Sequence, residues 1–318
     1  MDKKVCVLLC TYNRKICLEK LLNALDRQSY KLSGIILLDN HSTDGTIEHL
    51  VEMGIALDKN KINAVQESIF HEIPFYYYQN SVNAGGAGGF KKAFEIGLTY
   101  DFDFYWVMDD DVLPEPDCLE TLISGIDNSH KVCVPNRTCE NFKDNAVTKV
   151  NFDKFFKRVE EKEVISDFTG REKIEIVDFA FEGPLFHRDV LKNVGLPDES
   201  YFLLFDDSDY AYRCTKFTKI FFMVNAKLNR QLPLPNSSTP MYWKQYYMLR
   251  NSFVFDMRYG KNIIFRKLRP LYFCIFSYIR GIMNRSMPRI RYTKKAYYDA
   301  RHNLLGKQVE PGETFSRK

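Results

Sequence analysis

The chain has 318 residues, 45% of them hydrophobic and 14% aromatic, and its formal net charge is only +4. That length can hold one large domain or two modest ones, and the small net charge gives no reason to expect a nucleic-acid partner. The eight cysteines lack the paired spacing of a zinc site and suit a reducing cytoplasm. We expect no signal peptide, and no stretch reaches the roughly 20 apolar residues of a membrane span.

The first 125 residues alternate between strand-like and helix-like patterns. Aliphatic runs predict strands at 5–9, 34–38, 74–79 and 104–108. Helical spacing follows at 16–25, a polar loop at 42–46 opens a second helix, and a glycine-rich segment precedes a helix that runs to residue 98. Such alternation with short connections predicts a doubly wound α/β sheet.

The rest of the chain is less regular. Residues 130–180 are expected to form loops and antiparallel strands, and helices are predicted at 189–194, from Asp206 onward, and at 242–255. Between residues 261 and 301 we count eleven Lys or Arg, one acid and eight aromatics. Pro270 and Gly281 predict two short helices there rather than a long one. The simplest division is a catalytic domain at 1–255 and a helical, basic extension at 256–318.

Three consecutive carboxylates follow the apolar run that ends at Met108: Asp109, Asp110 and Asp111. Adjacent like charges repel, and ionised carboxylates are costly to bury without compensation. A hard divalent cation prefers oxygen ligands, so Mn²⁺ or Mg²⁺ carrying a diphosphate is one interpretation. A solvated acidic turn is the alternative.

Other polar residues also follow predicted strands. Parallel α/β sheets bind ligands at the carboxyl ends of their strands, where the sequence places Thr11, Asn13, Arg14 and Asp39. A nucleotide suits this set, because a carboxylate such as Asp39 can accept a hydrogen bond from a uracil or thymine imide. Alone, Asp39 would more often be a turn residue.

The glycine-rich segment contains Asn83, Gly85, Gly86, Gly88 and Gly89. It is not a dinucleotide fingerprint, which directly follows the first strand, and it lacks the Gly-Lys-Ser/Thr of a P-loop. Its glycines indicate close backbone approach. We expect a loop that presents N–H groups to a sugar or diphosphate, with a mobile flap as the alternative.

A second acidic cluster begins at Asp206 and continues through Asp207, Ser208 and Asp209. The two acidic clusters suggest a division of roles. The metal-bound carboxylates would neutralise a leaving phosphate, and the separate carboxylate would remove a proton. The alternative is a helix N-terminus at which acids are favoured by the helix dipole.

These motifs together resemble those of the inverting family-two glycosyltransferases, which have a GT-A fold. The resemblance rests on residues 7–14, 39–46 and 109–111, and it covers roughly residues 4–255. Residues 83–90, 205–210 and 246–251 are similar to motifs of bacterial galactofuranosyltransferases and the related rhamnosyltransferases.

The resemblance implies roles for the acids. Asp39 would contact the base and Asp110 the ribose or diphosphate, while Asp111 and Asp109 would hold the metal. Asp207 would be the general base, with Asp206 beside it. The family often has a histidine shortly before the 246–251 motif, whereas this chain has none at 228–233. Either Arg230 or Gln231 would take its place, or the metal would have fewer protein ligands.

The resemblance implies transfer of galactofuranose from UDP-galactofuranose to a lipid-linked or polysaccharide acceptor in bacterial surface glycan synthesis. A rhamnosyltransferase that uses dTDP-rhamnose is the nearest alternative. A nucleotidyltransferase would usually place its glycine-rich loop after the first strand, and a non-catalytic glycan-binding protein would not need both acidic clusters.

The C-terminal segment combines helical apolar spacing with many cations and aromatics. Such a helix can lie in a membrane interface, which predicts a cytoplasmic enzyme bound peripherally to the anionic inner face of the cell membrane. Packing on the catalytic domain, or a homo-oligomeric contact, is the alternative.

Overall fold

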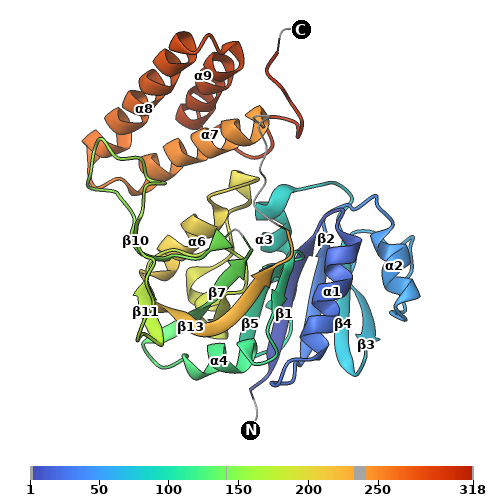
Figure 1. The fold of residues 1–318 in the computed structure, drawn as a ribbon. Helices are drawn as coiled ribbons and strands as arrows, with labels where there is room; N and C mark the ends of the chain where they lie inside the picture. The colour runs from blue at the N-terminus through green and yellow to red at the C-terminus, as the bar shows by residue number, and fades with distance from the viewer. Residues whose placement is uncertain (1–2, 141, 233–240, 317–318) are drawn as a thin grey trace.

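The computed structural model describes residues 3–140, 142–232 and 241–316 (Figure 1). Four neighbouring strands are parallel, in the order β5 (Phe104–Asp109), β1 (Val5–Thr11), β2 (Gly34–Asp39) and β4 (Ile73–Gln79). Buried aliphatic residues fill β1 and β2, as expected of strands covered on both faces. The predicted alternation over the first 125 residues is confirmed, although β3 (Gln66–Phe70), antiparallel to β4 at the edge, was not anticipated.

Beyond β5 the sheet becomes mixed. The order continues through β12 (Leu185–His187), β7 (His130–Cys139), β13 (Lys219–Arg230) and β11 (Lys173–Ile176). β12 and β11 are antiparallel to their neighbours, while β13 runs parallel to β7. The short strands β6 (Val112–Pro114) and β8 (Phe142–Lys143) pair with β13 and β7, and β9 (Ala146–Lys149) with β10 (Glu163–Ile165) forms a separate ribbon.

Helices cover both faces of the sheet. Alternate residues of β1 point to opposite sides: Val7 and Leu9 pack with helices α1 (Lys15–Asp26), α2 (Thr46–Glu52) and α4 (Cys118–Ser124). Cys6 and Leu8 pack in the layer that contains α3 (Gly85–Gly97), α5 (Arg188–Val194) and α6 (Asp206–Cys214). A short 3₁₀ turn, η1 (Glu199–Tyr201), leads toward α6.

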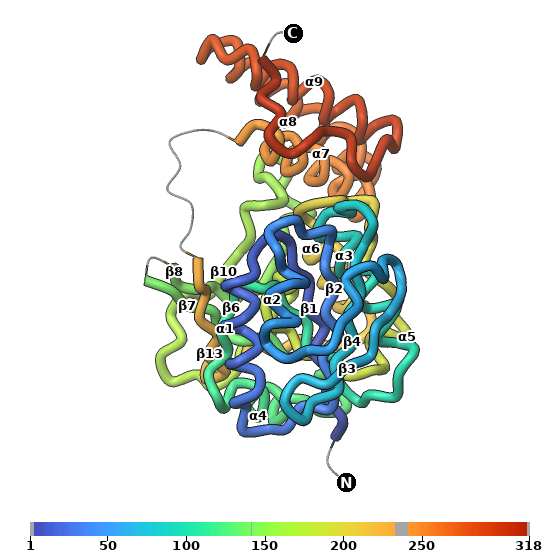
Figure 2. The backbone as a smooth tube through the Cα atoms, turned by 90° about the vertical axis from the view of Figure 1, so that its right-hand side faces the viewer, coloured from blue at the N-terminus to red at the C-terminus, as the bar shows by residue number. Residues whose placement is uncertain are grey.

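Three C-terminal helices, α7 (Tyr242–Tyr259), α8 (Ile263–Met283) and α9 (Met287–Arg301), form a bundle above the carboxyl ends of the parallel strands (Figures 1 and 2). Their shared core includes Phe202 and Phe205 from the segment before α6. The expected boundary between residues 255 and 256 falls inside α7. Among the described residues, no helix is long and apolar enough to cross a membrane.

Two helices, α8 and α9, follow residue 261 as predicted, but the expected breaks were wrong, because α8 continues through both Pro270 and Gly281. Arg269 is fully buried, pairs with both carboxylate oxygens of Asp256 and donates to the Asn151 carbonyl. These contacts anchor the helical turn that Pro270 would otherwise weaken. At Gly281 a Cβ would lie 2.8 Å from Ile290 Cγ1. Glycine therefore lets α9 approach α8 and does not end the helix.

Candidate active site

The strand ends named in the sequence meet at one edge of the sheet. Thr11 is paired with Asp39 across β1 and β2, and Cys10 is paired with Asp109 across β1 and β5. The acidic triplet, the first polar loop and Asp39 therefore share the edge above which the helical bundle lies (Figure 1). This is the edge where open α/β sheets bind ligands.

Arg14 joins two carboxylates of the triplet. Its Nη1 lies 3.0 Å from Asp110 Oδ1 and 2.8 Å from Asp111 Oδ2. Asp110 also accepts hydrogen bonds from Thr11 Oγ1 (2.6 Å) and from the Tyr12 amide (3.3 Å). Burial raises the Asp110 pKa to about 6, with Arg14 and Thr11 opposing that shift. The triplet is thus a partly desolvated site and not a solvated turn.

Asp109 has the least compensation of the three acids. Burial raises its pKa well above the usual range, and the charges of Asp111, Glu182 and Asp110 raise it further. Among the described residues, none donates a hydrogen bond to its carboxylate. An ionised carboxylate in this setting needs a cation, and carboxylate oxygens are the ligands that Mg²⁺ and Mn²⁺ prefer. The donor chemistry of Asp109 and Asp111 therefore fits a divalent ion.

Gln231, rather than Arg230, lies against the triplet. The pairing of β6 with β13 brings it there, and its amide N–H donates to the Asp111 carbonyl at 2.8 Å. Its Nε2 donates to the Cys17 carbonyl at 2.9 Å, whereas its buried Oε1 has no hydrogen-bond partner. Arg230 instead approaches Glu182, at 3.4 Å. No group of three His, Cys, Asp or Glu in the described part of the chain is placed to hold a metal.

Asp39 has a structural role at this edge. Its side chain is fully buried, and it accepts hydrogen bonds from the Ser42 amide (2.7 Å) and the Tyr77 hydroxyl (2.8 Å). Burial raises its pKa, and these two hydrogen bonds limit the rise. Asp39 therefore holds the turn after β2, as the turn alternative expected, and its contact with a base stays a prediction.

Two asparagines of the predicted set support backbone turns. Asn13 Oδ1 accepts from the Thr43 amide at 2.6 Å, and Asn83 Oδ1 accepts from the Gly85 amide at 2.8 Å. Asn83 also accepts from the Nδ2 of Asn40. These contacts tie the loops after β1, β2 and β4 together, which would keep a nucleotide-binding surface ordered.

The predicted glycine-rich loop was wrong, because α3 begins at Gly85 and includes all four glycines. At Gly85, where φ is +74°, a Cβ would lie 2.0 Å from the Phe202 carbonyl oxygen, and at Gly89 it would lie 2.4 Å from Cys10 Sγ. At Gly88 it would contact the Ala84 Cβ at 2.6 Å, whereas Gly86 faces open space. The glycines therefore let α3 lie close to β1 and to the segment before α6.

The motif at residues 246–251 anchors that same segment. The Asn251 Nδ2 donates to the carbonyls of Tyr201 (3.1 Å), Leu203 (2.8 Å) and Leu204 (2.8 Å). Arg250, fully buried, donates to the Tyr201 carbonyl at 2.8 Å. Phe202, Leu204 and Phe205 all have positive φ, which costs about 1–3 kcal/mol per residue and needs such support. The motif thus holds a strained connection that ends at the second acidic cluster.

The members of the second cluster differ in their surroundings. Asp209 accepts hydrogen bonds from the hydroxyls of Tyr201 (3.1 Å) and Tyr259 (2.7 Å) and from Arg213 Nε (2.9 Å), so it is a structural acid. Asp206 and Asp207 are instead a coupled pair at the start of α6. Burial and their mutual repulsion raise the pKa of Asp206, and burial and Asp178 raise that of Asp207.

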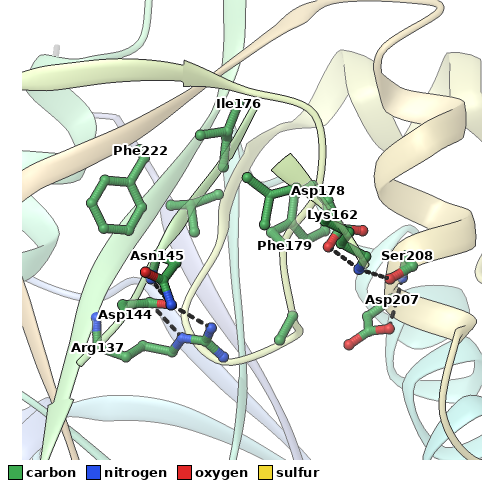
Figure 3. Close-up of a pocket in the computed structure, with 13 residues that line it drawn as sticks. Arg137, Asp144, Asn145, Lys162, Ile176, Asp178, Phe179, Asp207, Ser208 and Phe222 are labelled. Carbon is green, nitrogen blue, oxygen red and sulfur yellow. Dashed lines mark hydrogen bonds and ion pairs between the residues drawn. The ribbon is translucent and has the colours of Figure 1, made fainter. Parts of the chain in front are cut away.

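Asp207 lines a cavity of about 230 Å³. Figure 3 shows Arg137 and Asp144 on one side of this cavity and Lys162, Asp178 and Asp207 on the other. Arg137 binds Asp144 through two nitrogens, at 2.7 and 2.8 Å, and Lys162 pairs with Asp178 and donates to Ser208 Oγ at 3.0 Å. A small cavity with many donors and acceptors suits a hydroxylated ligand.

Arg137 links the surroundings of the two acidic clusters: its Nη1 lies 3.3 Å from Glu182, and it lines the same cavity as Asp207. Burial raises the pKa of the Cys10 thiol at the end of β1, and so do the charges of Asp109 and Asp110 from the first cluster, of Asp206 from the second, and of Asp39. Glu182 adds negative charge next to Asp109. Sequence reasoning missed Arg137, Lys162, Asp178 and Glu182, because they come from the irregular middle of the chain. The only signal was the position of Glu182 in a short apolar run before a predicted helix.

A sequence model of the family described as "Glycosyl transferase family 2" matches residues 6–195, more than half of the chain. The galactofuranosyltransferase GlfT1 of Mycolicibacterium smegmatis is 24% identical over 216 residues, 67% of this chain and 65% of that protein. The abequosyltransferase RfbV of Salmonella typhimurium is 30% identical over 129 residues, 40% of this chain and 34% of that protein. The matches therefore span less than two thirds of either relative.

The mannosyltransferase PcManGT from Pyrobaculum calidifontis, solved with GDP-Man and Mn²⁺, has a similar fold. The TM-score is 0.53 at 15% identity, and the match covers 95% of this chain and 76% of that one. At this identity, the likeness shows the architecture alone.

Proposed function

The chain belongs to glycosyltransferase family 2 and has the GT-A fold, and from this premise we propose that it transfers galactofuranose from UDP-galactofuranose to a lipid-linked or polysaccharide acceptor of a bacterial surface glycan. The observation that supports the proposal most is that Arg137 joins the surroundings of the two acidic clusters: it lies 3.3 Å from Glu182, whose charge acts on Asp109, and it lines the same cavity as Asp207. One cluster suits a diphosphate and its cation, and the other supplies a base.

The reaction would be a single displacement with inversion. Asp207 accepts the proton of an acceptor hydroxyl while that oxygen forms a bond to the anomeric carbon of the donor. The bond between the anomeric carbon and the phosphate oxygen breaks, and UDP leaves with the bonding electrons. The raised pKa of the Asp206–Asp207 pair lets Asp207 hold the proton more readily than an ordinary aspartate, so turnover should fall on the acidic side at a higher pH than usual.

Asp109, Asp111 and the free Oε1 of Gln231 are the oxygens that we propose for Mn²⁺ or Mg²⁺, whose charge would offset that of the leaving diphosphate. We propose that Arg14 contacts the same diphosphate, and its ion pairs with Asp110 and Asp111 support this role. Arg14 is the more exposed partner of these ion pairs, with 42% of its side chain accessible, so it can turn toward a ligand.

The experiment that tests the donor is a thermal-shift screen of nucleotide sugars with Mn²⁺. UDP-galactofuranose should raise the melting temperature more than UDP-glucose or dTDP-rhamnose. The curated relatives transfer two different sugars by their names, which keeps rhamnosyl transfer from dTDP-rhamnose as the second candidate. A larger shift with dTDP-rhamnose would favour that alternative, and a protein that responds to no nucleotide sugar would contradict transferase activity.

We also place the enzyme at the anionic inner face of the cell membrane, through the outer face of α8. An apolar stripe is exposed along the whole helix: Ile264, Leu268, Leu271, Ile275, Ile279 and Ile282. Phe156, 74% exposed, packs against Tyr272 beside this stripe. Residues 263–283 contain no acid, and three of their cations, Arg266, Lys267 and Arg280, are exposed. Anionic lipid complements that charge, whereas a second copy of α8 would repel it.

Co-sedimentation with anionic vesicles at low salt tests the attachment. The full chain should pellet with the vesicles, the Leu271→Ser/Ile275→Ser variant should remain in the supernatant, and Tyr298→Ser, which changes an exposed aromatic of α9, should behave as wild type. A wild-type chain that stays in the supernatant contradicts the attachment. If the wild type is a dimer and the double variant is a monomer, the stripe is instead a contact between two copies of the chain.

A further inference from the structure

A second cavity, of about 360 Å³, lies in the C-terminal bundle. Its apolar wall includes Leu204, Met248 and Leu249, and its polar side includes Arg158, Lys244 and Arg289. Within the described ranges, no acidic residue lines it. It is separate from the cavity beside Asp207, and the proposed chemistry does not use it, although Met248 and Leu249 belong to the motif at residues 246–251.

Among the described residues, no carboxylate forms an ion pair with any of these three half-buried cations, whereas the fully buried Arg269 is paired with Asp256. Arg158 packs over the Phe273 ring at 5.4 Å and Lys244 over the Trp243 ring at 5.4 Å. Burial lowers the pKa of Lys244, and the charge of Arg14 lowers it further. The cavity therefore concentrates positive charge that an anion would compensate.

Two helix N-termini reinforce this charge. Lys244 is the third residue of α7, and Arg289 is the third residue of α9, so the first turn of each helix, which carries partial positive charge, borders the cavity. Neither helix has an acid in its first turn. Together with the cations, these ends suit a phosphate or diphosphate, and the apolar wall suits a hydrocarbon chain attached to it.

The position of the cavity connects it to both parts of the active site. Leu204 is three residues before Asp207, and Lys244 is close enough to Arg14 for their charges to interact. An anion bound here would therefore hold the molecule that carries it near the base and near the donor site.

We propose that this cavity binds the phosphate or diphosphate of a lipid-linked acceptor, with Lys244, Arg289 and Arg158 as its anion-binding residues. The inference rests on the proposed transferase function, because it names the acceptor class of that site. The lipid chain follows the apolar wall, and the glycan attached to the diphosphate extends toward Asp207.

Trp243 provides a direct signal for the test, because it contacts Lys244, whereas the only other tryptophan, Trp106, is fully buried in the sheet. Farnesyl diphosphate, below its critical micelle concentration, should change the Trp243 fluorescence of the full chain in a saturable way. Farnesol and inorganic diphosphate should each bind about ten-fold more weakly or worse, since each lacks one half of the recognised chemistry.

Lys244→Gln and Arg289→Gln should each weaken farnesyl diphosphate binding by about ten-fold, the usual effect of losing a charge-assisted contact. Lys294→Gln, on α9 but over the Tyr278 ring and outside the cavity, is the matched control and should bind as wild type. Calorimetry with UDP and Mn²⁺ should give the same affinity for all these proteins.

The outcomes separate the two proposals. If Lys244→Gln binds farnesyl diphosphate as tightly as Lys294→Gln does, the cavity assignment is overturned. If UDP competes with farnesyl diphosphate and suppresses the fluorescence change, the cavity is instead part of the donor site, which also overturns the assignment. Inorganic diphosphate that binds as tightly as farnesyl diphosphate would make it a site for free anions and overturn the lipid part. If the wild-type protein does not bind UDP, the result contradicts the transferase function instead.

Discussion

Replacing Asn251 should reduce turnover without weakening donor binding. Its amide nitrogen donates to three carbonyls of the strained segment before Asp206, and among the described residues only the Tyr201 carbonyl has further donors, Arg250 and the Leu203 amide. Asn251→Ala would leave the Leu203 and Leu204 carbonyls without a hydrogen-bond donor. The cost is about 1–3 kcal/mol for each buried carbonyl, or roughly 2–6 kcal/mol of folding stability in total. The positive-φ segment would relax and carry Asp207 with it.

A displacement of about 1 Å at a reacting group can cost on the order of 10²-fold. We therefore expect kcat of Asn251→Ala to fall by about ten- to a hundred-fold, with the UDP dissociation constant unchanged. Steady-state kinetics, calorimetry and urea unfolding would measure the three quantities. Ser252→Ala is the matched control, because its hydroxyl bonds to the Leu249 carbonyl of its own helix and to Glu160, and not to the segment before Asp206. Unchanged kcat, or equal losses in kcat and UDP affinity, would refute the reasoning.

Three further results follow from the same contacts. Gln231→Ala should weaken Mn²⁺ binding by about ten-fold in electron paramagnetic resonance titrations, whereas the control Gln308→Ala should bind Mn²⁺ as the wild type does. Equal Mn²⁺ affinities of Gln231→Ala and the wild type would show that Gln231 is not a ligand. Asp209→Asn should lower the melting temperature but retain kcat while folded, because Asp209 accepts structural hydrogen bonds from Tyr201, Tyr259 and Arg213. If Asp209→Asn is stable but inactive, Asp209 is the general base instead. Arg269→Met should cost about 3–5 kcal/mol by leaving Asp256 buried and unpaired.

The pH dependence of that last variant has a defined sign. Burial raises the Asp256 pKa to about 6, and Arg269 opposes the rise, so removing Arg269 raises it further. Protonation of Asp256 then relieves the unpaired charge, and the stability loss should be largest near pH 8 and smaller near pH 5. Urea unfolding of wild type and Arg269→Met at both pH values measures this, and a loss that grows toward pH 5 would contradict the assignment.

The parts of the fold set by local pattern could be predicted from sequence. The strands at residues 5–9, 34–38 and 104–108 were found because continuous aliphatic runs are typical of strands buried on both faces. Their carboxyl ends meet at one edge because parallel strands share direction, so Thr11, Asp39 and Asp109 could be grouped without coordinates.

Features that depend on distant partners could not be predicted. The glycines at 85 and 89 resemble a loop by composition, but the residues that require them, Phe202 and Cys10, lie far away in sequence. Pro270 resembles a helix break, yet the ion pair of its neighbour Arg269 is made with Asp256 on another helix. Asp209 has the same local pattern as Asp207, and only its tyrosine and arginine partners show that it is structural.

The measurement that tests the central claim most directly is transfer from UDP-galactofuranose to a lipid-linked glycan acceptor by the wild type and by Asp207→Asn, with UDP binding followed in parallel. The wild type should release UDP and form a product of inverted anomeric configuration. Asp207→Asn should bind UDP normally and lose roughly 10²–10⁴ in turnover. Wild-type turnover by Asp207→Asn, or a wild-type protein that releases no UDP from this donor, would contradict the account.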